Sequence, residues 1–260
     1  AVFSDIFPDR NWFTGPNITM SVESAVEAQA KLPLESHPGT RFEYQVGYPV
    51  IGRILEIVTG KTLNDFYEER IFKPLRMKDS GFYLSEDKFD RFPTCYRPTP
   101  ADNEWKLVVS DNPKTSEKVV GPKIYFEAGG GGGGVLSTIA DYSRFAQMLL
   151  NGGELDGTRI LGRKTVELMT SSHTADDLYI PLTGPGFGFG MGVGVYKGCT
   201  PPLIRSVGTF GWSGAAGTTC MIDPREKLIW LCFTQVMMHR TMPGNTCHED
   251  FERLVYQSLI

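Results

Sequence analysis

Apolar residues in the first third of the chain recur at the spacing of helix faces. A short pattern over Val22–Leu32 predicts one helix, and Pro38-Gly39 then breaks the chain. A second helix is predicted over Val50–Val58, because its apolar residues fall on one face and Gly60 supplies a stop. The chain therefore begins with helices rather than strands.

Two further helices are predicted between Thr62 and Gly153. Thr62, with Asp65 three residues on, is typical of a capped helix N-terminus, and Pro74 marks the end of that helix. Residues 84–125 are polar and without a clear period, which predicts a long excursion on the surface. A glycine run at 129–134 precedes the next helix, which starts at Ser137. The apolar residues expected on these two helix faces are Leu63, Phe66, Tyr67 and Ile71, then Ile139, Tyr142, Phe145, Met148 and Leu149.

The pattern changes to strands after Pro185. Phe187–Val195 alternates large and small residues, the period of a strand. Gly208–Thr218 is a strand of small residues, and Asp223-Pro224 turns it into the apolar strand Leu228–Phe233. These segments predict an antiparallel arrangement.

The last segment is predicted to be a helix that covers this sheet. Thr246 opens it, with Glu249 three residues on. Its expected buried residues are Phe251, Leu254, Val255 and Leu259. Helices followed by an antiparallel sheet flanked by helices indicate an α+β fold, with a mainly helical and loop region at 1–185 and the strands and last helix at 186–260, together one domain.

Composition excludes several kinds of partner. With 260 residues, 41% of them hydrophobic, and a formal net charge of −4, the chain favours a globular protein over one that binds nucleic acid or an anionic membrane. No apolar run has the length of a bilayer span, and residues 1–5 do not look like the start of a signal peptide, which leaves cytoplasm and periplasm both open. Five cysteines and four scattered histidines show no metal-ligand spacing, so no metal and no cofactor is expected.

The stretch Gly208–Thr218 carries the strongest functional signal. A strand gives up side chains for glycine where another backbone or a ligand approaches closely. The triplet Trp212-Ser213-Gly214 resembles the third motif of the serine β-lactamase and penicillin-binding-protein superfamily, and its Trp-x-Gly form is similar to the class C-related, family VIII-type esterase branch. The resemblance implies that Trp212, Ser213 and Gly214 bind substrate and that the backbone N–H of Ala215 stabilises an oxyanion. From the residues alone, an ordinary glycine-rich hairpin packed by Trp212 is also open.

The segment His37–Tyr48 resembles the second motif of the same family, in which Pro-Gly-Thr and an aromatic residue precede Tyr-x-Asn. The resemblance implies that Tyr44 is the general base and that Gln45 and Val46 face the substrate. Val46 replaces the family's Asn and cannot hydrogen-bond a substrate amide, which weakens any expectation of β-lactamase activity. A half-buried tyrosine at a helix entry is the alternative interpretation of Tyr44.

The first family motif, Ser-x-x-Lys, supplies the nucleophile and its activating lysine. Its only literal match is Ser85–Lys88, whose acidic and polar surroundings predict an exposed loop. Ser213 lacks the context of a nucleophile elbow. The resemblance covers most of residues 28–260 and implies a fold of the β-lactamase/transpeptidase type that is N-terminally incomplete here.

Three functions follow from this reading. The first is an esterase-like serine hydrolase that acts on a small ester or amide through an acyl-serine, with its nucleophile motif missing from this chain. The second is a non-catalytic binding module, and the third is an enzyme that uses another serine. If early strands are missing, the sheet has an open edge, which predicts self-association.

Overall fold

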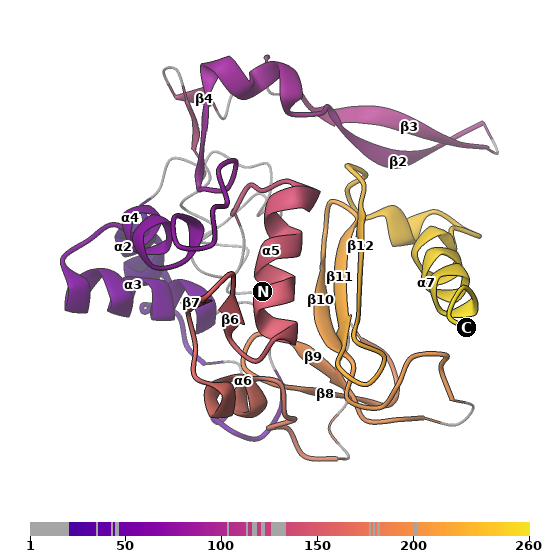
Figure 1. Cartoon of the computed structure of the whole chain (residues 1–260). Helices are drawn as coiled ribbons and strands as arrows, with labels where there is room; N and C mark the ends of the chain where they lie inside the picture. Colours follow the sequence, from indigo (N-terminus) through magenta and orange to yellow (C-terminus); the bar gives the residue numbers. More distant parts are fainter. Residues whose placement is uncertain are drawn as a thin grey trace. The chain divides into compact units, whose positions relative to one another are not determined.

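The structure is a computed structural model. It describes residues 21–260 apart from 35, 43, 45, 46, 103, 113, 116–118, 121, 122, 126–133, 177, 179, 181, 182, 200 and 201. The contacts within the chain divide it into two compact units, one of residues 1–92 and 113–141, the other of residues 93–112 and 142–260. Figure 1 labels the helices and strands named below. The division at residue 185 that the sequence suggests stays a prediction.

Three helices in the first unit confirm the helices predicted before Pro74. They are α2 (Val22–Gln29), α3 (Gly47–Thr59) and α4 (Leu63–Tyr67), and α4 continues as a π-helical turn at Glu68–Phe72. Their ends are set by local caps. Ser21 accepts from the backbone N–H of Ser24, and Thr62 accepts from that of Asp65 at 3.1 Å, as the spacing of Thr62 and Asp65 predicts.

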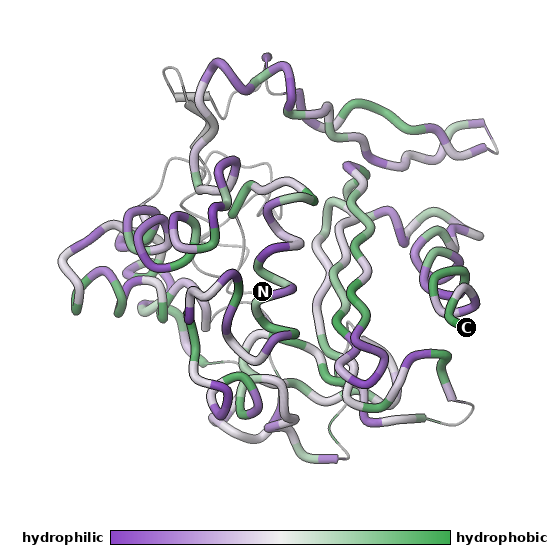
Figure 2. The backbone as a smooth tube through the Cα atoms, in the orientation of Figure 1, coloured by the Kyte–Doolittle hydropathy of each residue, from purple (hydrophilic) through white to green (hydrophobic). Residues whose placement is uncertain are grey.

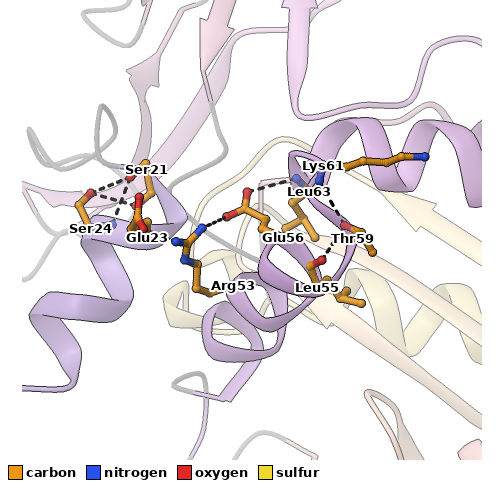
Figure 3. Close-up of polar contacts among 9 residues, drawn as sticks. All are labelled: Ser21, Glu23, Ser24, Arg53, Leu55, Glu56, Thr59, Lys61 and Leu63. Carbon is orange, nitrogen blue, oxygen red and sulfur yellow. Dashed lines mark hydrogen bonds and ion pairs between the residues drawn. The ribbon is translucent and has the colours of Figure 1, made fainter.

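A small polar network joins these three helices. Arg53 of α3 pairs with Glu23 of α2 and, at 3.3 Å, with Glu56 of its own helix (Figure 3). Glu56 also accepts from the backbone N–H of Leu63 at 3.2 Å, which ties α3 to the first turn of α4. Leu63 itself is fully buried. Polar links at the helix ends and one buried apolar residue together set the angle between α3 and α4.

The apolar stripe of α3 is exposed in this structure. Four of its residues have more than half of their surface accessible: Ile51, Ile54, Ile57 and Val58. They recur at positions i, i+3, i+6 and i+7, so they share one side of the helix. An apolar helix side of this kind is the normal mark of a surface that contacts something else.

The remainder of the first unit contains short strands and a 3-10 turn. β1 (Tyr83–Ser85) pairs with β5 (Lys123–Tyr125), and β5 pairs with β4 (Val119–Val120). The literal Ser-x-x-Lys match begins at Ser85, the last residue of β1, and continues into the 3-10 turn Glu86–Arg91. Its Lys88 pairs with Asp79 at 2.9 Å and also donates to the carbonyl of Lys78. Hydrogen bonds from Arg91 and Lys88 lower the pKa of Asp79 to about 2, so its carboxylate is charged. Lys88 is therefore paired with Asp79 rather than with Ser85.

The surface excursion expected over residues 84–125 contains regular structure that sequence reasoning missed. β2 (Cys95–Ala101) and β3 (Glu104–Asp111) form an antiparallel hairpin in the second unit. Every residue of β3 from Glu104 to Val109 is exposed. Because neither face of this strand is buried, its sequence shows no alternation from which a strand could be predicted.

Helix α5 (Ile139–Leu150) confirms the helix predicted after Ser137, and it crosses from the first unit into the second at Tyr142. Beyond it come the small hairpin of β6 (Glu154–Leu155) and β7 (Thr158–Arg159), then α6 (Arg163–Met169). Tyr142 packs edge-on against Phe233 with ring centroids 5.8 Å apart, which places this part of α5 against one face of the main sheet.

The main sheet of the second unit has five antiparallel strands in the order β12-β11-β10-β9-β8. Two predictions about it are wrong. The alternation over Phe187–Val195 spans two strands, β8 (Phe187–Phe189) and β9 (Gly194–Tyr196), joined by a turn in which the N–H of Gly190 donates to the carbonyl of Val193 at 2.8 Å. Because glycine alternates with larger residues throughout this stretch, the glycines of the turn do not interrupt the alternation in the sequence.

The second correction concerns Gly208–Thr218, which is not one strand. β10 (Phe210–Gly214) ends before a turn, and β11 (Thr218–Asp223) returns beside it before the predicted turn to β12 (Leu228–Phe233). The turn needs Gly217, which has a φ of +76° and where an added Cβ would lie 2.1 Å from the hydroxyl oxygen of Thr234. Figure 2 shows the apolar residues concentrated on β11 and β12, while β10 is nearly neutral.

The last helix, α7 (Cys247–Gln257), covers the other face of this sheet, but with a face that was not predicted. Its buried residues are His248, Glu252 and Tyr256, whereas Leu254 is 62% exposed and Phe251 and Leu259 are also exposed. Positions i, i+4 and i+8 of a helix advance about 6 Å per step, close to two residues of a strand. The buried polar face therefore follows β11, whose residues Thr219 and Asp223 hydrogen-bond His248 and Tyr256.

Candidate functional site

Among the described residues, the C-terminal half of β10 extends beyond the end of its neighbour β9 in the main sheet. β10 pairs with β11 over its whole length, but β9 pairs with it only at Phe210 and Gly211. Within the described part of the chain, the pairing of β10 with β9 ends at Gly211, so Ser213 and Gly214 lie beyond it. A strand edge of this kind presents backbone N–H and C=O groups to any ligand that lies along it.

Trp212 is held in place by close packing. Its ring lies edge-on to Phe189 with centroids 5.1 Å apart. It also lies over Gly194, where an added Cβ would come within 3.2 Å of the ring. The side chain is half-buried, so it both packs the strands β8 and β9 and leaves part of its surface accessible. Packing of the sheet and binding of a substrate are therefore compatible roles for Trp212.

Ala215 follows β10 directly and is the second residue of the tight turn Gly214–Gly217. The N–H of Gly217 donates to the carbonyl of Gly214 at 3.1 Å and closes the turn. The carbonyl of Ala215 accepts from the N–H of Met238 at 2.7 Å, which fixes the orientation of its residue. Among the residues that the structure describes, nothing accepts a hydrogen bond from the N–H of Ala215.

The segment after β12 holds this turn from the outside. The N–H of Val236 donates to the carbonyl of Ala216 at 3.0 Å, and that of Thr234 to the carbonyl of Gly217 at 2.9 Å. The segment is itself bonded to β2, because the N–H of Met237 donates to the carbonyl of Tyr96 at 2.7 Å. The turn is thus pinned by backbone bonds on several sides and is pre-organised.

Behind β10 lies a buried polar chain that sequence reasoning missed. Thr219 of β11 donates to the hydroxyl oxygen of Ser213 at 3.1 Å, and its own oxygen lies 2.9 Å from Nδ1 of His248. The ring of His248 lies against that of His239, tilted by 42° and with centroids 4.4 Å apart. Burial lowers the pKa of both imidazoles, so both rings are neutral at pH 7. The signal that could have found His248 is its i, i+4, i+8 spacing with Glu252 and Tyr256.

Tyr44 lies in the first unit, half-buried, just before α3. Burial raises the pKa of Tyr48, and nearby Tyr44 raises it further, so the two phenols are neighbours. Gln45 and Val46 lie outside the described residues, as does the glycine run at 129–133. The structure brings Trp212–Ala215 together on one strand end of the second unit, and the roles assigned to these residues and to Tyr44 stay predictions.

In the part of the chain that the structure describes, no three His, Cys, Asp or Glu side chains are grouped so that they could hold a metal ion. No helix within the same part is long and apolar enough to cross a membrane.

Comparison with known proteins gives a consistent result. The family model described as Beta-lactamase matches residues 4–243. Protein Rv1367c of Mycobacterium tuberculosis is 33% identical over 230 residues, which are 85% of this chain and 54% of that protein. The chain thus spans about half the length of the curated relatives it matches.

Solved structures share the fold at low identity. EstCE1, described as a hydrolase with promiscuous acyltransferase activity, is similar with a TM-score of 0.74 and 22% identity, over 92% of this chain and 62% of its own. Simvastatin synthase (LovD) from Aspergillus terreus is similar with a TM-score of 0.69 and 22% identity, over 90% of this chain and 61% of its own. At this identity the likeness shows the fold alone, an α+β fold with antiparallel sheets.

Proposed function

This chain belongs to the beta-lactamase family of serine hydrolase fold, and we propose that it forms the oxyanion-binding and substrate-binding strand of an esterase-like enzyme. The reaction would be hydrolysis of a small carboxylic ester, or transfer of its acyl group, through an acyl-serine intermediate. The description of EstCE1 as a hydrolase with acyltransferase activity supports this reaction class. Val46, in place of the family's Asn, favours esters over β-lactams.

The backbone N–H of Ala215 carries the proposal. Attack on an ester carbonyl converts its oxygen into an anion, which is stabilised by donors that are already oriented before the reaction. The Ala215 N–H has this property, because its turn is held by Met238, Thr234 and Val236 while the N–H itself has no acceptor among the described residues. A backbone donor does not depend on the side chain, so alanine serves as well as any other residue.

The remaining roles follow the family resemblance. A serine outside these 260 residues would attack the carbonyl and lose its proton to Tyr44, which would pass it to the leaving alcohol. Water would then release the acid by the same proton route. Trp212, Ser213 and Gly214 would line the acyl or alcohol side of the site, and Gln45 and Val46 the side of the tyrosine.

Ser85 is a poor alternative nucleophile because Lys88 pairs with Asp79 instead of activating it. If the protein has no nucleophile, the same site would bind this class of ligand without reacting with it. The engagement of Lys88, which leaves the described residues without an activated Ser-x-x-Lys pair, is the observation that favours this second function.

Substitution of Ala215 tests the proposal. Ala215→Pro removes the N–H, and proline suits this position because it is the second residue of a turn and follows the extended Gly214. Ala215→Ser keeps the N–H and is the matched control. In the protein expressed from its complete gene, with p-nitrophenyl acetate as substrate, we expect Ala215→Pro to lower kcat by about 10²–10³-fold and Ala215→Ser to stay near wild type. Equal activity of the two variants would contradict the role of this N–H.

A further inference from the structure

We propose that His248 is a positioning residue that sets, through Thr219, the direction in which Ser213 offers its hydroxyl hydrogen to a substrate oxygen. The inference rests on the proposed function, because Ser213 belongs to the strand assigned to substrate binding. It concerns a residue of α7 that lies 35 positions along the chain from Ser213 and carries none of the family motifs.

The geometry orders the three groups into a chain. Ser213 and Thr219 are directly opposite each other on β10 and β11, so their side chains share the sheet face that α7 covers. Thr219 is 2% exposed, and its hydroxyl donates to Ser213 at 3.1 Å. A hydroxyl group has one hydrogen. At the 2.9 Å contact with His248, the oxygen of Thr219 must therefore accept, and Nδ1 of His248 must carry the proton.

The surroundings of the ring support this protonation state. Nε2 of His248 is buried and has no hydrogen-bond partner among the described residues. A hydrogen on Nε2 would be a buried donor without an acceptor, which is costly, so the hydrogen is better placed on Nδ1. The backbone of Gly217 raises the pKa of His248, but it is not within hydrogen-bond geometry of Nε2.

The charged and titratable groups facing His248 are few. His239 lies against it from the short 3-10 turn His239–Thr241, Arg240 lies on the same turn, and Glu249 is its neighbour on α7. Burial and then Arg240 lower the pKa of His248, and Glu249 opposes them. In the neutral ring only one nitrogen carries a hydrogen, so the direction of the chain depends on which nitrogen that is.

The consequence concerns Ser213. Since its oxygen already accepts from Thr219, its own hydrogen is directed elsewhere, and among the described residues no acceptor takes it. Ser213 is half-buried and two residues from Ala215. It would thus act as a donor toward a substrate carbonyl, ester or carboxylate oxygen.

The first test is the tautomer of His248, read from imidazole ¹⁵N chemical shifts of the 260-residue chain at pH 7.5. We expect the Nδ1–H tautomer, the reverse of the one that free histidine favours in water. Thr219→Ser keeps a hydroxyl and should keep this tautomer, whereas Thr219→Val removes the acceptor and should shift the ring toward Nε2–H. A wild-type ring in the Nε2–H form, or one that does not respond to Thr219→Val, would overturn the proposal.

Kinetics of the complete protein test the positioning role. His248→Asn places an amide N–H where Nδ1–H stands and should restore activity, while His248→Ala should lower kcat/KM for an ester substrate by about tenfold, the loss expected for one hydrogen bond. We expect most of this loss in KM. A loss of equal size in both variants would show that His248 only supports the fold. The NMR result does not depend on activity, so a protein with the expected tautomer but no esterase activity would refute the proposed function and leave the buried chain in place.

Discussion

The buried pair of Arg205 and Glu252 is the feature of the second unit whose removal has the most specific consequences. Arg205 is bonded to Glu252 of α7 at 2.5 Å, and both side chains are about nine-tenths buried. The guanidinium also lies over the ring of Phe187, 5.3 Å from its centroid. Because Glu252 lies between His248 and Tyr256 on the same helix face, this pair sets how α7 rests on the sheet and hence where His248 stands.

Replacing Arg205 by Met leaves the carboxylate of Glu252 buried without its partner. Breaking a buried pair from one side costs about 3–5 kcal/mol, whereas replacing both partners by apolar residues is often neutral or stabilising. We therefore expect Arg205→Met to lose about 3–5 kcal/mol at pH 8, and the double variant Arg205→Met/Glu252→Met to lie within about 1 kcal/mol of wild type or above it.

The loss should depend on pH in a defined direction. Burial raises the pKa of Glu252 above its ordinary value of 4.5, Arg205 opposes this, and Glu249 adds to it. A group with a raised pKa favours folding at low pH, and its ionisation opposes folding as the pH rises. Without Arg205 the pKa rises further. At pH 4 the carboxyl is protonated in both the folded and the unfolded state, so the loss of stability in Arg205→Met is small. The loss grows as the pH rises toward 8.

Urea unfolding of the three proteins at pH 4 and pH 8 measures this directly, provided that the m-values agree. Equal losses at the two pH values would refute the reasoning, since the cost would then come from packing rather than from a buried charge. A loss below about 1 kcal/mol at pH 8 would also refute it, because a surface ion pair contributes an amount in that range.

Three further predictions concern other parts of the chain. Gly211→Ala should destabilise the protein by about 1–3 kcal/mol in urea unfolding, because an added Cβ would lie 2.0 Å from the carbonyl oxygen of Cys220; a neutral result would mean that β10 and β11 can separate locally. Tyr256→Phe should cost about 1.5–3 kcal/mol at pH 7, since the phenol donates to the buried carboxylate of Asp223 at 2.7 Å. Burial alone would raise the pKa of Asp223, but this bond and others hold it below its ordinary value. The difference in stability between Tyr256→Phe and wild type should therefore vanish as the pH falls below that value, and a difference that does not change with pH would contradict this. The exposed apolar side of α3 and the part of β10 that extends beyond β9 predict self-association of the 260-residue chain, and a compact monodisperse monomer in solution scattering would count against it.

Local signals allowed part of the fold to be predicted. The N-terminal cap of α4 could be predicted from Thr62 and Asp65, because they lie three residues apart and interact within one turn. The hairpin of β2 and β3 left no such signal, because an exposed strand has no buried face to mark in its sequence. The turn after Gly214 was missed because small residues carry no period, and its shape depends on Thr234 and Met238, which come from a distant segment.

The site shows the same division between local and distant information. Trp212, Ser213 and Gly214 were identified from their own motif, since the signal lies in consecutive residues. His248 was passed over as one of four scattered histidines. Its significance appears only when α7 packs on β11, because a polar stripe at i, i+4 and i+8 looks like a solvated face until Thr219, Arg205 and Asp223 supply its partners.

The central claim is that this chain provides the oxyanion strand of an acyl-serine hydrolase whose nucleophile lies outside these residues. Labelling with a fluorophosphonate probe, followed by intact mass and peptide mapping, tests it most directly. The account predicts no adduct on the 260-residue chain and one adduct per protein expressed from the complete gene, on a serine of a Ser-x-x-Lys motif outside residues 1–260. A stoichiometric adduct on Ser213, Ser85 or any other serine of this chain would contradict it, and no adduct on the complete protein would leave a binding module.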